Sequence, residues 1–288
     1  MYLEVKDLKK SYGEGGGYVQ VLKGITAGVE QGEMCVIQGT SGSGKSTLLR
    51  SLNLLEIPTA GSVFMEGMDI TDRHADINLH RQKMGMVFQH FNLFPHMTVL
   101  RNMTLAPIKL KGKTREQAEE QAMELLGKVG LADRANAYPD QLSGGQKQRV
   151  AIVRALCMEP ELLVADEPIA SLDVSIQAQI VNLFRHLQRE HGFSFLFIAH
   201  DLAMVEFLCD RVGVLYHGKL VEVAPVRALY DHPIHPYTKA LLAAMPIPDP
   251  RIERKRVLPD FSPGQFPLTG ELIEAEPDHF VLQEGGAR

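Results

Sequence analysis

The sequence predicts an α/β fold built from buried parallel strands and amphipathic helices. Two stretches carry this prediction. A short apolar run at residues 34–37 leads into the glycine-rich stretch 39–47 and then into an apolar helical pattern, which is the order strand, turn, helix. A second apolar run at residues 162–165 ends in two adjacent carboxylates, Asp166 and Glu167. Because ligands bind beyond the carboxyl ends of strands in such sheets, both stretches point to a functional edge.

The composition is that of an ordinary globular protein. Hydrophobic residues make up 45% of the 288 residues, charged residues make up 23%, and the formal net charge is −5. This balance does not suggest a nucleic-acid partner, and we interpret the charged run 251–256 as a solvated face. Cys35, Cys157 and Cys209 are far apart, which favours buried, reduced thiols in a cytosolic protein. We find no signal-peptide pattern and no apolar run long enough to span a bilayer.

The glycine-rich stretch has the spacing Gly-x-x-x-x-Gly-Lys-Ser of a phosphate-binding loop. Glycines let successive backbone N–H groups approach a polyphosphate, and the positive end of the following helix faces the same anion. Lys45 adds a positive charge for the β- and γ-phosphates, and the Ser46 hydroxyl is a candidate Mg²⁺ ligand. The alternative, a glycine-rich surface turn, would not require a Lys-Ser pair at this offset.

Short strands are expected around this loop at residues 2–8, 19–29, 33–38 and 62–65. Tyr12 precedes a turn at residues 13–17 and is either a stacking partner for an adenine ring or a half-buried strand residue. A strand at residues 85–88 ends at Gln89, which lies either at the ligand edge of the sheet or on the surface as an ordinary amide.

Residues 90–141 show helical patterns in place of the short strands that precede them. They predict a mostly helical subdomain inserted into the α/β core. One helix is expected over residues 98–110, with Pro107 kinking or ending it. The clearest helix spans residues 114–129, with Thr114 as the N-cap and Gln117 three residues later. Its apolar stripe consists of Ala118, Ala122, Leu125, Leu126 and Val129.

The second half carries further candidate site residues. The stretch 142–146, Leu-Ser-Gly-Gly-Gln, opens a helix expected at residues 147–157. It is either a helix cap or a second phosphate contact, and the upstream loop favours the contact. Asp166 can hold Mg²⁺ through its water shell, and Glu167 can align and deprotonate an attacking water. His200, after the strand at residues 193–199, is either a donor to a γ-phosphate oxygen or a surface residue.

The C-terminal part reads as a hairpin, short helices and an appended segment. The hairpin is expected at residues 211–216 and 219–224, and the helices at residues 225–230 and 236–244. We interpret His232 and His235 as turn and capping residues, not metal ligands. From residue 246 the chain becomes Pro-rich and charged, which predicts a small segment with short strands.

The ordered set of motifs resembles the ATP-binding subunits of ABC transporters. The stretch 39–47 is similar to the Walker A loop, and Gln89 to the Q-loop glutamine. Residues 142–146 are similar to the signature, and residues 162–167 to the Walker B strand with its catalytic glutamate. His200 matches the switch histidine, and the stretch Ser171 to Asp173 is close to the D-loop, with Ala170 and Ser171 in exchanged order. A signature downstream of a phosphate loop is specific to this family.

The resemblance implies a P-loop NTPase core of the α/β class with an antiparallel β subdomain and an inserted helical subdomain at about residues 90–158. It implies an ABC ATPase domain at residues 1–245 and a C-terminal extension at residues 246–288. The implied ligands are ATP and Mg²⁺. The implied catalytic residues are Lys45, Gln89, Glu167 and His200, and the residues for Mg²⁺ are Ser46, Gln89 and Asp166. The implied ATP-binding residues are Tyr12, Gly39, Thr40, Ser41, Gly42, Ser43, Gly44, Lys45, Ser46, Thr47, Ser143, Gly144, Gly145, Gln146 and Asp173.

The resemblance also implies partners. Family members form head-to-tail dimers in which each ATP lies between the Walker A loop of one subunit and the signature of the other. The helical subdomain and Gln89 would contact an integral membrane permease, which places the chain at the cytoplasmic face of the membrane as a peripheral subunit. An extracytoplasmic substrate-binding protein would be an indirect partner, and no nucleic acid is expected.

Different segments of the sequence resemble two different subfamilies of these ATP-binding subunits. Residues 88–100 resemble ATPases of polar amino-acid importers, whereas residues 165–179, 235–242 and 277–281 resemble those of oligopeptide and dipeptide importers. No cysteine follows Cys209, so we predict no iron–sulfur site. The expected function is the ATPase subunit of an importer for a polar amino acid or a short peptide. The competing class is a non-transport ABC ATPase acting on DNA or the ribosome, whose usual coiled-coil insertions or paired nucleotide domains are missing. A P-loop kinase would give no reason for the stretch 142–146.

Overall fold

The computed structural model describes residues 1–13, 17–168, 172–199, 205–206, 208–244, 261 and 268–283. The chain forms two compact units. The first unit comprises residues 1–29, 33–71 and 198–288, and the second comprises residues 30–32 and 72–197. Within the described ranges, none of the helices has both the length and the apolar character needed to cross a membrane.

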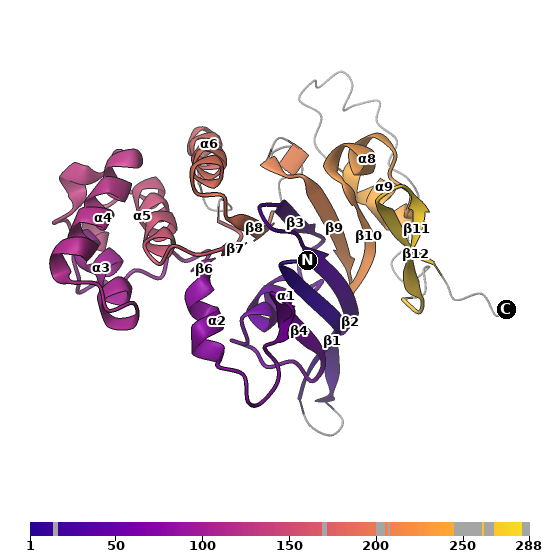
Figure 1. The fold of residues 1–288 in the computed structure, drawn as a ribbon. Helices are drawn as coiled ribbons and strands as arrows, with labels where there is room; N and C mark the ends of the chain where they lie inside the picture. Colours follow the sequence, from indigo (N-terminus) through magenta and orange to yellow (C-terminus); the bar gives the residue numbers. More distant parts are fainter. Residues whose placement is uncertain are drawn as a thin grey trace, which may run out of the picture. The chain divides into compact units, whose positions relative to one another are not determined.

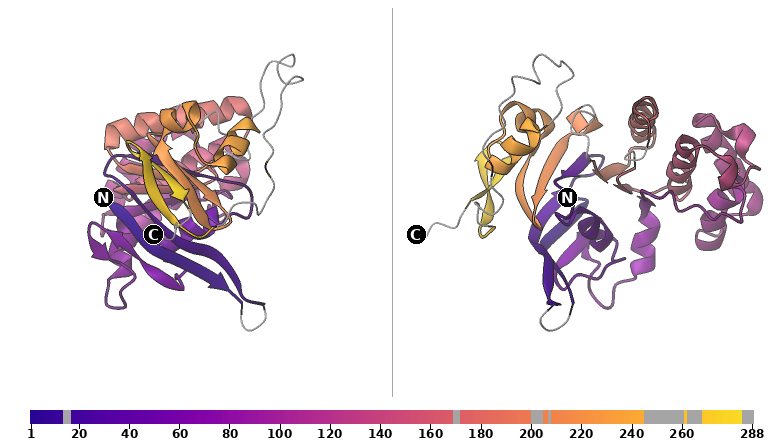
Figure 2. Two further views of the ribbon diagram at one scale, coloured as in Figure 1. Left: turned by 90° about the vertical axis from the view of Figure 1, so that its right-hand side faces the viewer. Right: turned by 180° about the vertical axis from the view of Figure 1, so that it is seen from behind.

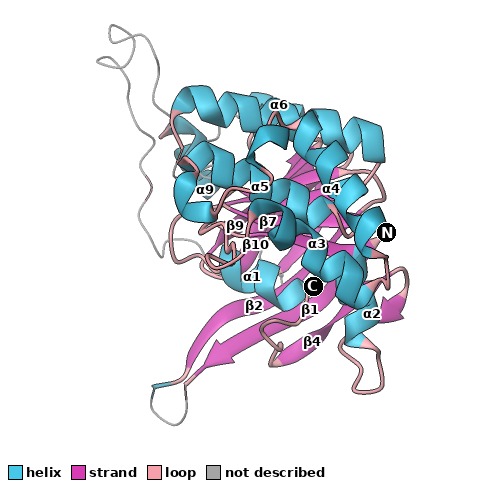
Figure 3. Cartoon of the chain, turned by 90° about the vertical axis from the view of Figure 1, so that its left-hand side faces the viewer, coloured by secondary structure: helices cyan, strands magenta, loops and turns pink. Residues whose placement is uncertain are grey.

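The first unit contains an antiparallel sheet of four strands in the order β2-β1-β4-β5. Figure 3 shows β1, β2 and β4 side by side. Leu3 at the start of β1 is paired with Val29 of β2 and with Met65 of β4. The strands are β1 (Leu3–Tyr12), β2 (Val19–Val29), β4 (Ala60–Met65) and β5 (Met68–Asp69). The strand predicted at residues 19–29 is therefore confirmed.

A second set of strands in the first unit follows the order β11-β12-β10-β9-β3. In it β3 runs parallel to β9, and the remaining pairs are antiparallel. Figure 2 shows the yellow β11–β12 hairpin next to β10. The strands are β3 (Met34–Gln38), β9 (Arg211–Tyr216), β10 (Lys219–Pro225), β11 (Glu271–Glu276) and β12 (His279–Gln283), and the helices are α1 (Lys45–Leu52), α8 (Val226–Asp231) and α9 (Pro236–Ala243).

The second unit has strands in the order β8-β7-β6, and β6 runs parallel to β7. They are β6 (Met84–Val87), β7 (Leu162–Asp166) and β8 (Ser194–Ile198). Every residue of β7 and β8 is buried, which explains why both read as continuous apolar runs. Phe184 of α6 (Val174–His191) packs on Phe195 at a centroid distance of 4.7 Å, and Phe195 stacks on Phe197 at 5.1 Å. Before β6, α2 (Ile77–Lys83) begins at its N-cap Asp76.

Three helices of the second unit lie together at the left of Figure 1. They are α3 (Val99–Leu110), α4 (Arg115–Lys128) and α5 (Gly144–Leu156), and the 3₁₀ turns η2 (Ala132–Arg134) and η3 (Pro139–Gln141) lie between α4 and α5. The predicted capping box of α4 is present, with Gln117 N donating to Thr114 Oγ1 and Thr114 N donating to Gln117 Oε1. All five members of the predicted apolar stripe are buried.

Two local expectations need adjustment. Pro107 lies inside α3 and does not end it, since the helix continues to Leu110. The helix expected from residue 147 begins at Gly144 instead, because the reciprocal cap of Ser143 and Gln146 draws both glycines into the first turn. The predicted free cysteines are all buried, and burial raises the pKa of the Cys157 thiol to about 12.

Candidate nucleotide-binding site

The glycine-rich loop between β3 and α1 depends on unusual backbone angles. Gly39, Gly42 and Gly44 have φ values of +151°, +76° and +103°, which L side chains rarely adopt. A Cβ atom at Gly39 would collide with the carbonyl oxygen of Leu215. Gly44 is the N-cap of α1 and makes no side-chain cap bond. The loop therefore needs glycine at these positions both for its turn and for its close approach to β9.

The buried side chain of Lys45 is hydrogen-bonded to the backbone of the loop. Its Nζ atom donates to the carbonyl oxygens of Gly39 and Thr40 at 2.9 Å each. The hydroxyl of Ser43 is also buried and has no hydrogen-bond partner among the described residues. An ammonium group, an unsatisfied hydroxyl and a helix N-terminus in one loop are groups that a polyphosphate can satisfy, so the loop fits the predicted phosphate ligand.

Two contacts that the sequence did not predict fix the ends of this loop. The amide of Gly218, in the β9–β10 turn, donates to the carbonyl oxygen of Ser43 at 2.9 Å. The amide of Thr40 donates to the hydroxyl of Tyr237 at 2.9 Å. Gly218 and Tyr237 lie far along the chain from the loop, and no local pattern could have paired them with it.

The second unit places Gln89 and the two carboxylates at one sheet edge. Val87 of β6 is in register with Ala165 of the parallel strand β7, so Asp166, the last residue of β7, and Gln89, two residues after β6, lie at the carboxyl ends of neighbouring strands. Asp166 is only 7% exposed. Glu167 has a φ of +50°, a left-handed conformation that costs a non-glycine residue on the order of 1 kcal/mol. Such a backbone turns the chain sharply beyond the strand.

The stretch 142–146 opens α5 with a reciprocal cap. Gln146 N donates to Ser143 Oγ at 3.3 Å, and Ser143 N donates to Gln146 Oε1 at 2.9 Å. A Cβ atom at Gly145 would lie 2.8 Å from Ile176 Cγ2 of α6. The glycine is therefore required where the two helices approach. Asp173, the exposed N-cap of α6, makes no side-chain cap bond.

The structure gives less information about the other residues that were predicted for the site. Tyr12 is 40% exposed, and Lys10 Nζ lies 4.9 Å from the centroid of its ring. Ser41 and Gly42 form the turn of the loop, and Ser46 and Thr47 lie in the first turn of α1. His200 lies outside the described residues, as do Ala170 and Ser171 of the predicted D-loop and the charged run 251–256. The roles predicted for all of these residues stay predictions.

Comparison with known proteins identifies the family. A family model described as ABC transporter matches residues 22–170, which is more than half of the chain. The chain belongs to the ABC transporter ATP-binding subunits. A second model, described as the C-terminal region of oligopeptide/dipeptide transporters, matches residues 221–265.

The ABC ATPase has relatives of both predicted subfamilies. It is 44% identical to the oligopeptide transport ATP-binding protein OppF of Bacillus subtilis over 97% of this chain and 95% of that protein. It is 42% identical to the glutamine transport ATP-binding protein GlnQ of Geobacillus stearothermophilus over 82% of this chain and 96% of that protein. A solved dimer of the ATP-binding cassette MJ0796, bound to ADP and Pi, matches with a TM-score of 0.72 and 36% identity, covering 78% of this chain and 99% of that one. The ABC ATPase is thus an importer-type ATPase with the predicted α/β fold.

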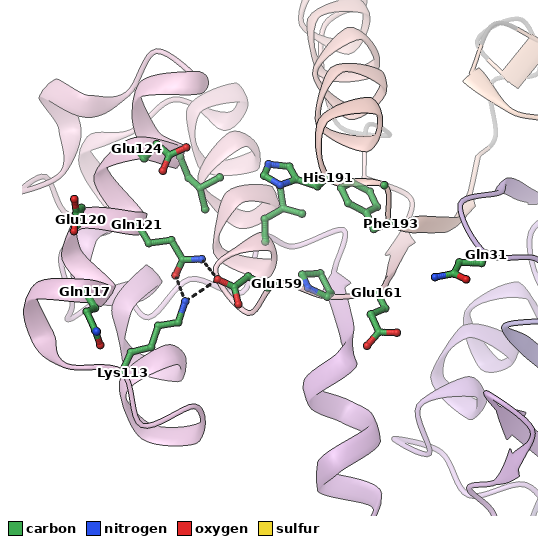
Figure 4. A pocket seen from close by; sticks show the side chains of 14 residues that line it. Gln31, Lys113, Gln117, Glu120, Gln121, Glu124, Glu159, Glu161, His191 and Phe193 are labelled. Atoms are coloured by element: carbon green, nitrogen blue, oxygen red, sulfur yellow. Dashed lines mark hydrogen bonds and ion pairs between the residues drawn. The ribbon is translucent and has the colours of Figure 1, made fainter.

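A cavity of about 670 Å³ lies within the second unit. Figure 4 shows Lys113 pointing toward Glu159 and Gln121, with carboxylates around them. Lys113 Nζ is 2.7 Å from Glu159 Oε1, and this hydrogen bond lowers the pKa of the Glu159 carboxyl. The cavity also borders Glu161, which comes just before β7, whereas Asp166 ends that strand. No residue predicted for the site lines it among those described.

Proposed function

We propose that the ABC ATPase powers uptake of short peptides through a partner permease. The observation that carries the proposal is the match of residues 221–265 to the oligopeptide/dipeptide transporter C-terminal region. The similarity to OppF, which extends over 97% of this chain, also supports it. The similarity to the glutamine-transport protein GlnQ extends over only 82% of this chain. The domain limits at residues 1–245 and 246–288, with the helical subdomain at about 90–158, belong to the same proposal.

In this proposal the loop 39–47 binds the phosphates of ATP through its amides and Lys45. Ser46, Gln89 and Asp166 would hold Mg²⁺, because hydroxyl, amide and carboxylate oxygens are the ligands that this ion prefers. The ion supplies charge neutralisation at the phosphates. Glu167 accepts a proton from the attacking water, and His200 donates to the γ-phosphate.

The proposed partners follow the family. Two copies, or this chain and a related one, form a head-to-tail dimer in which the stretch 142–146 of one subunit completes the site of the other. The solved dimer of MJ0796 supports a dimer. The permease contacts the helices α3 to α5 and Gln89, and the subunit lies peripherally at the cytoplasmic face of the membrane. A substrate-binding protein delivers the peptide on the other side.

Reconstitution tests the substrate. The tagged chain is purified from detergent-solubilised membranes of its host, and the co-purifying permease is placed in proteoliposomes with its binding protein. We expect tri- to pentapeptides to stimulate ATP hydrolysis and to accumulate, and free glutamine to do neither. Stimulation by free amino acids alone would reverse the assignment. Recovery of ribosomes or DNA without a membrane protein would favour the non-transport class.

A further inference from the structure

The phosphate-binding loop is tied to helix α9 through one hydroxyl. Tyr237 Oη accepts a hydrogen bond from Thr40 N at 2.9 Å and lies 3.4 Å from Thr40 Oγ1. The carbonyl oxygen of the same threonine accepts from Lys45 Nζ. Thr40 is therefore held on its amide side by Tyr237 and on its carbonyl side by Lys45, so its peptide planes have little freedom to turn.

Tyr237 is itself held rigidly. It is 3% exposed, and its ring lies 4.3 Å from the ring of Tyr216 and 5.4 Å from that of Phe261, centroid to centroid. Aromatic packing of this kind fixes the direction of the hydroxyl at a small cost in side-chain entropy. The backbone amide of Tyr237 donates to His235 Nδ1 at 3.1 Å, which caps α9.

The start of α9 is anchored in turn to the C-terminal hairpin. Glu222 of β10 accepts hydrogen bonds from Ile234 N at 2.8 Å and from His235 N at 3.0 Å. It also lies 2.7 Å from His279 Nε2 of β12, and both side chains are fully buried. A buried carboxylate with three partners resists displacement, because moving any partner exposes an unpaired charge. The hairpin, Glu222, the α9 cap and Tyr237 thus form one continuous set of contacts that reaches Thr40.

We propose that Tyr237 is a positioning residue for the phosphate-binding loop, and that the β11–β12 hairpin influences nucleotide binding through Glu222, His235 and Tyr237. The inference rests on the proposed role of the loop in binding ATP. A loop that must present several amides to a polyphosphate binds more tightly when its backbone is held in place beforehand. Tyr237 provides this constraint from the part of the chain that matches the peptide-transporter C-terminal region.

Tyr237→Phe tests the role of the hydroxyl, because it removes one oxygen and keeps the ring. In the full chain we expect the Kd for a fluorescent ATP analogue to rise roughly 3- to 10-fold, the worth of one hydrogen bond. KM for ATP should rise by the same factor while kcat changes less than about 2-fold, and the unfolding midpoint should shift only slightly, because a single hydrogen bond within the fold is lost. Amide exchange in the peptide covering residues 39–47 should accelerate. Tyr18→Phe, at a tyrosine that is 60% exposed and lies just before β2, is the matched control and should behave as the unaltered chain.

A second variant tests the hairpin. His279→Leu should raise the Kd for the analogue in the same direction, and the pair of changes with Tyr237→Phe should weaken binding less than the product of the single effects, since both act on one set of contacts. If His279→Leu does not fold, Tyr237→Phe decides alone. Unchanged Kd, KM and loop exchange in Tyr237→Phe would overturn the inference.

Lys45→Ala separates this failure from a failure of the proposed function. If Lys45→Ala abolishes binding of the analogue while Tyr237→Phe binds normally, the loop assignment stands and the inference about Tyr237 is wrong. If Lys45→Ala binds the analogue normally, the assignment of the loop itself is wrong.

Discussion

Glu222 Oε1 and His279 Nε2 lie 2.7 Å apart, and neither side chain is exposed to solvent. The two residues come from β10 and β12, 57 positions apart in the sequence. The pair joins the appended hairpin to the sheet that carries the phosphate-binding loop.

Loss of this pair should destabilise the chain strongly. His279→Leu leaves Glu222 buried with only two backbone donors, which costs on the order of 3–5 kcal/mol for a broken buried pair. The measurement is urea unfolding followed by circular dichroism. His232→Leu is the control, because His232 Nδ1 lies 3.0 Å from Glu276 Oε1 but its side chain is 69% exposed, so its loss should cost less than about 1 kcal/mol. Equal effects of the two changes would argue that burial adds nothing to the contact between Glu222 and His279.

Glu167→Gln should slow ATP hydrolysis by about 10²- to 10⁴-fold, the usual loss for a missing general base. ATP binding should persist and trap the dimer, which size-exclusion chromatography with ATP would detect. Glu161→Gln is the control, because Glu161 comes just before the same strand β7, which ends at Asp166. A Glu167→Gln protein with normal turnover would show that another group takes the proton.

Replacing each of the two glycines that open α5 by alanine should affect the stability of the chain differently. In Gly145→Ala the new Cβ would lie 2.8 Å from Ile176 Cγ2, whereas in Gly144→Ala it would lie 3.8 Å from Leu172 Cδ2. We expect Gly145→Ala to lower the free energy of unfolding by about 1 kcal/mol through overpacking. Gly144→Ala should be neutral or slightly stabilising, because alanine favours the helix. Thermal unfolding of both variants makes the comparison, and the reverse order would contradict this packing.

The cap of α9 should be sensitive to acid. Burial lowers the pKa of His235 below its ordinary value of 6.5, and the nearby Glu222 carboxylate opposes this shift only in part. The folded chain therefore binds fewer protons at this group than the unfolded chain, so its stabilisation is complete above about pH 6.5 and decreases as the pH falls toward the lowered pKa. His235→Asn retains a cap acceptor without this proton. Unfolding free energies between pH 5 and 8 should fall less steeply for His235→Asn, and parallel curves would refute the assignment.

Dilution should reduce the activity of the isolated subunit. If the stretch 142–146 of a second copy completes the site, ATP hydrolysis per subunit must fall once the concentration drops below the dimerisation range. The measurement is the specific ATPase rate across several decades of protein concentration, with light scattering to follow the dimer. A specific rate that stays constant after the dimer has dissociated would show that a single subunit suffices.

Local rules were sufficient for much of the fold. Thr114 and Gln117 form the predicted capping box because both partners lie within one helical turn. The hairpin predicted at residues 211–216 and 219–224 is likewise present as β9 and β10, and both residues of its turn, His217 and Gly218, have positive φ values. Pro107 was harder, because proline weakens a helix without always ending it, and the burial of this residue in α3 outweighs its missing donor.

Contacts between residues that are far apart along the chain could not be predicted from the sequence. Thr40 and Tyr237 are 197 positions apart, and a tyrosine in a Pro-Tyr-Thr sequence gives no sign that its hydroxyl meets a loop amide. The motif resemblance located the stretch 39–47, Asp166 and Glu167 as candidates. It could not supply the packing that fixes the loop, because hydrogen bonds of this range depend on the finished tertiary fold.

The contacts from the hairpin to the loop limit where this subunit can be cut and joined to another. A chimera made with an amino-acid importer ATPase by exchanging the tail at residue 246 would keep Glu222 and Tyr237 but remove His279. The chimera would then bury the Glu222 carboxylate without the imidazole of His279. This carboxylate lies next to helix α9, whose Tyr237 holds the phosphate-binding loop. A graft that moves residues 219–283 as one block keeps all of these partners together, and the new host must then match β9, which pairs with β10, and Thr40, which contacts Tyr237.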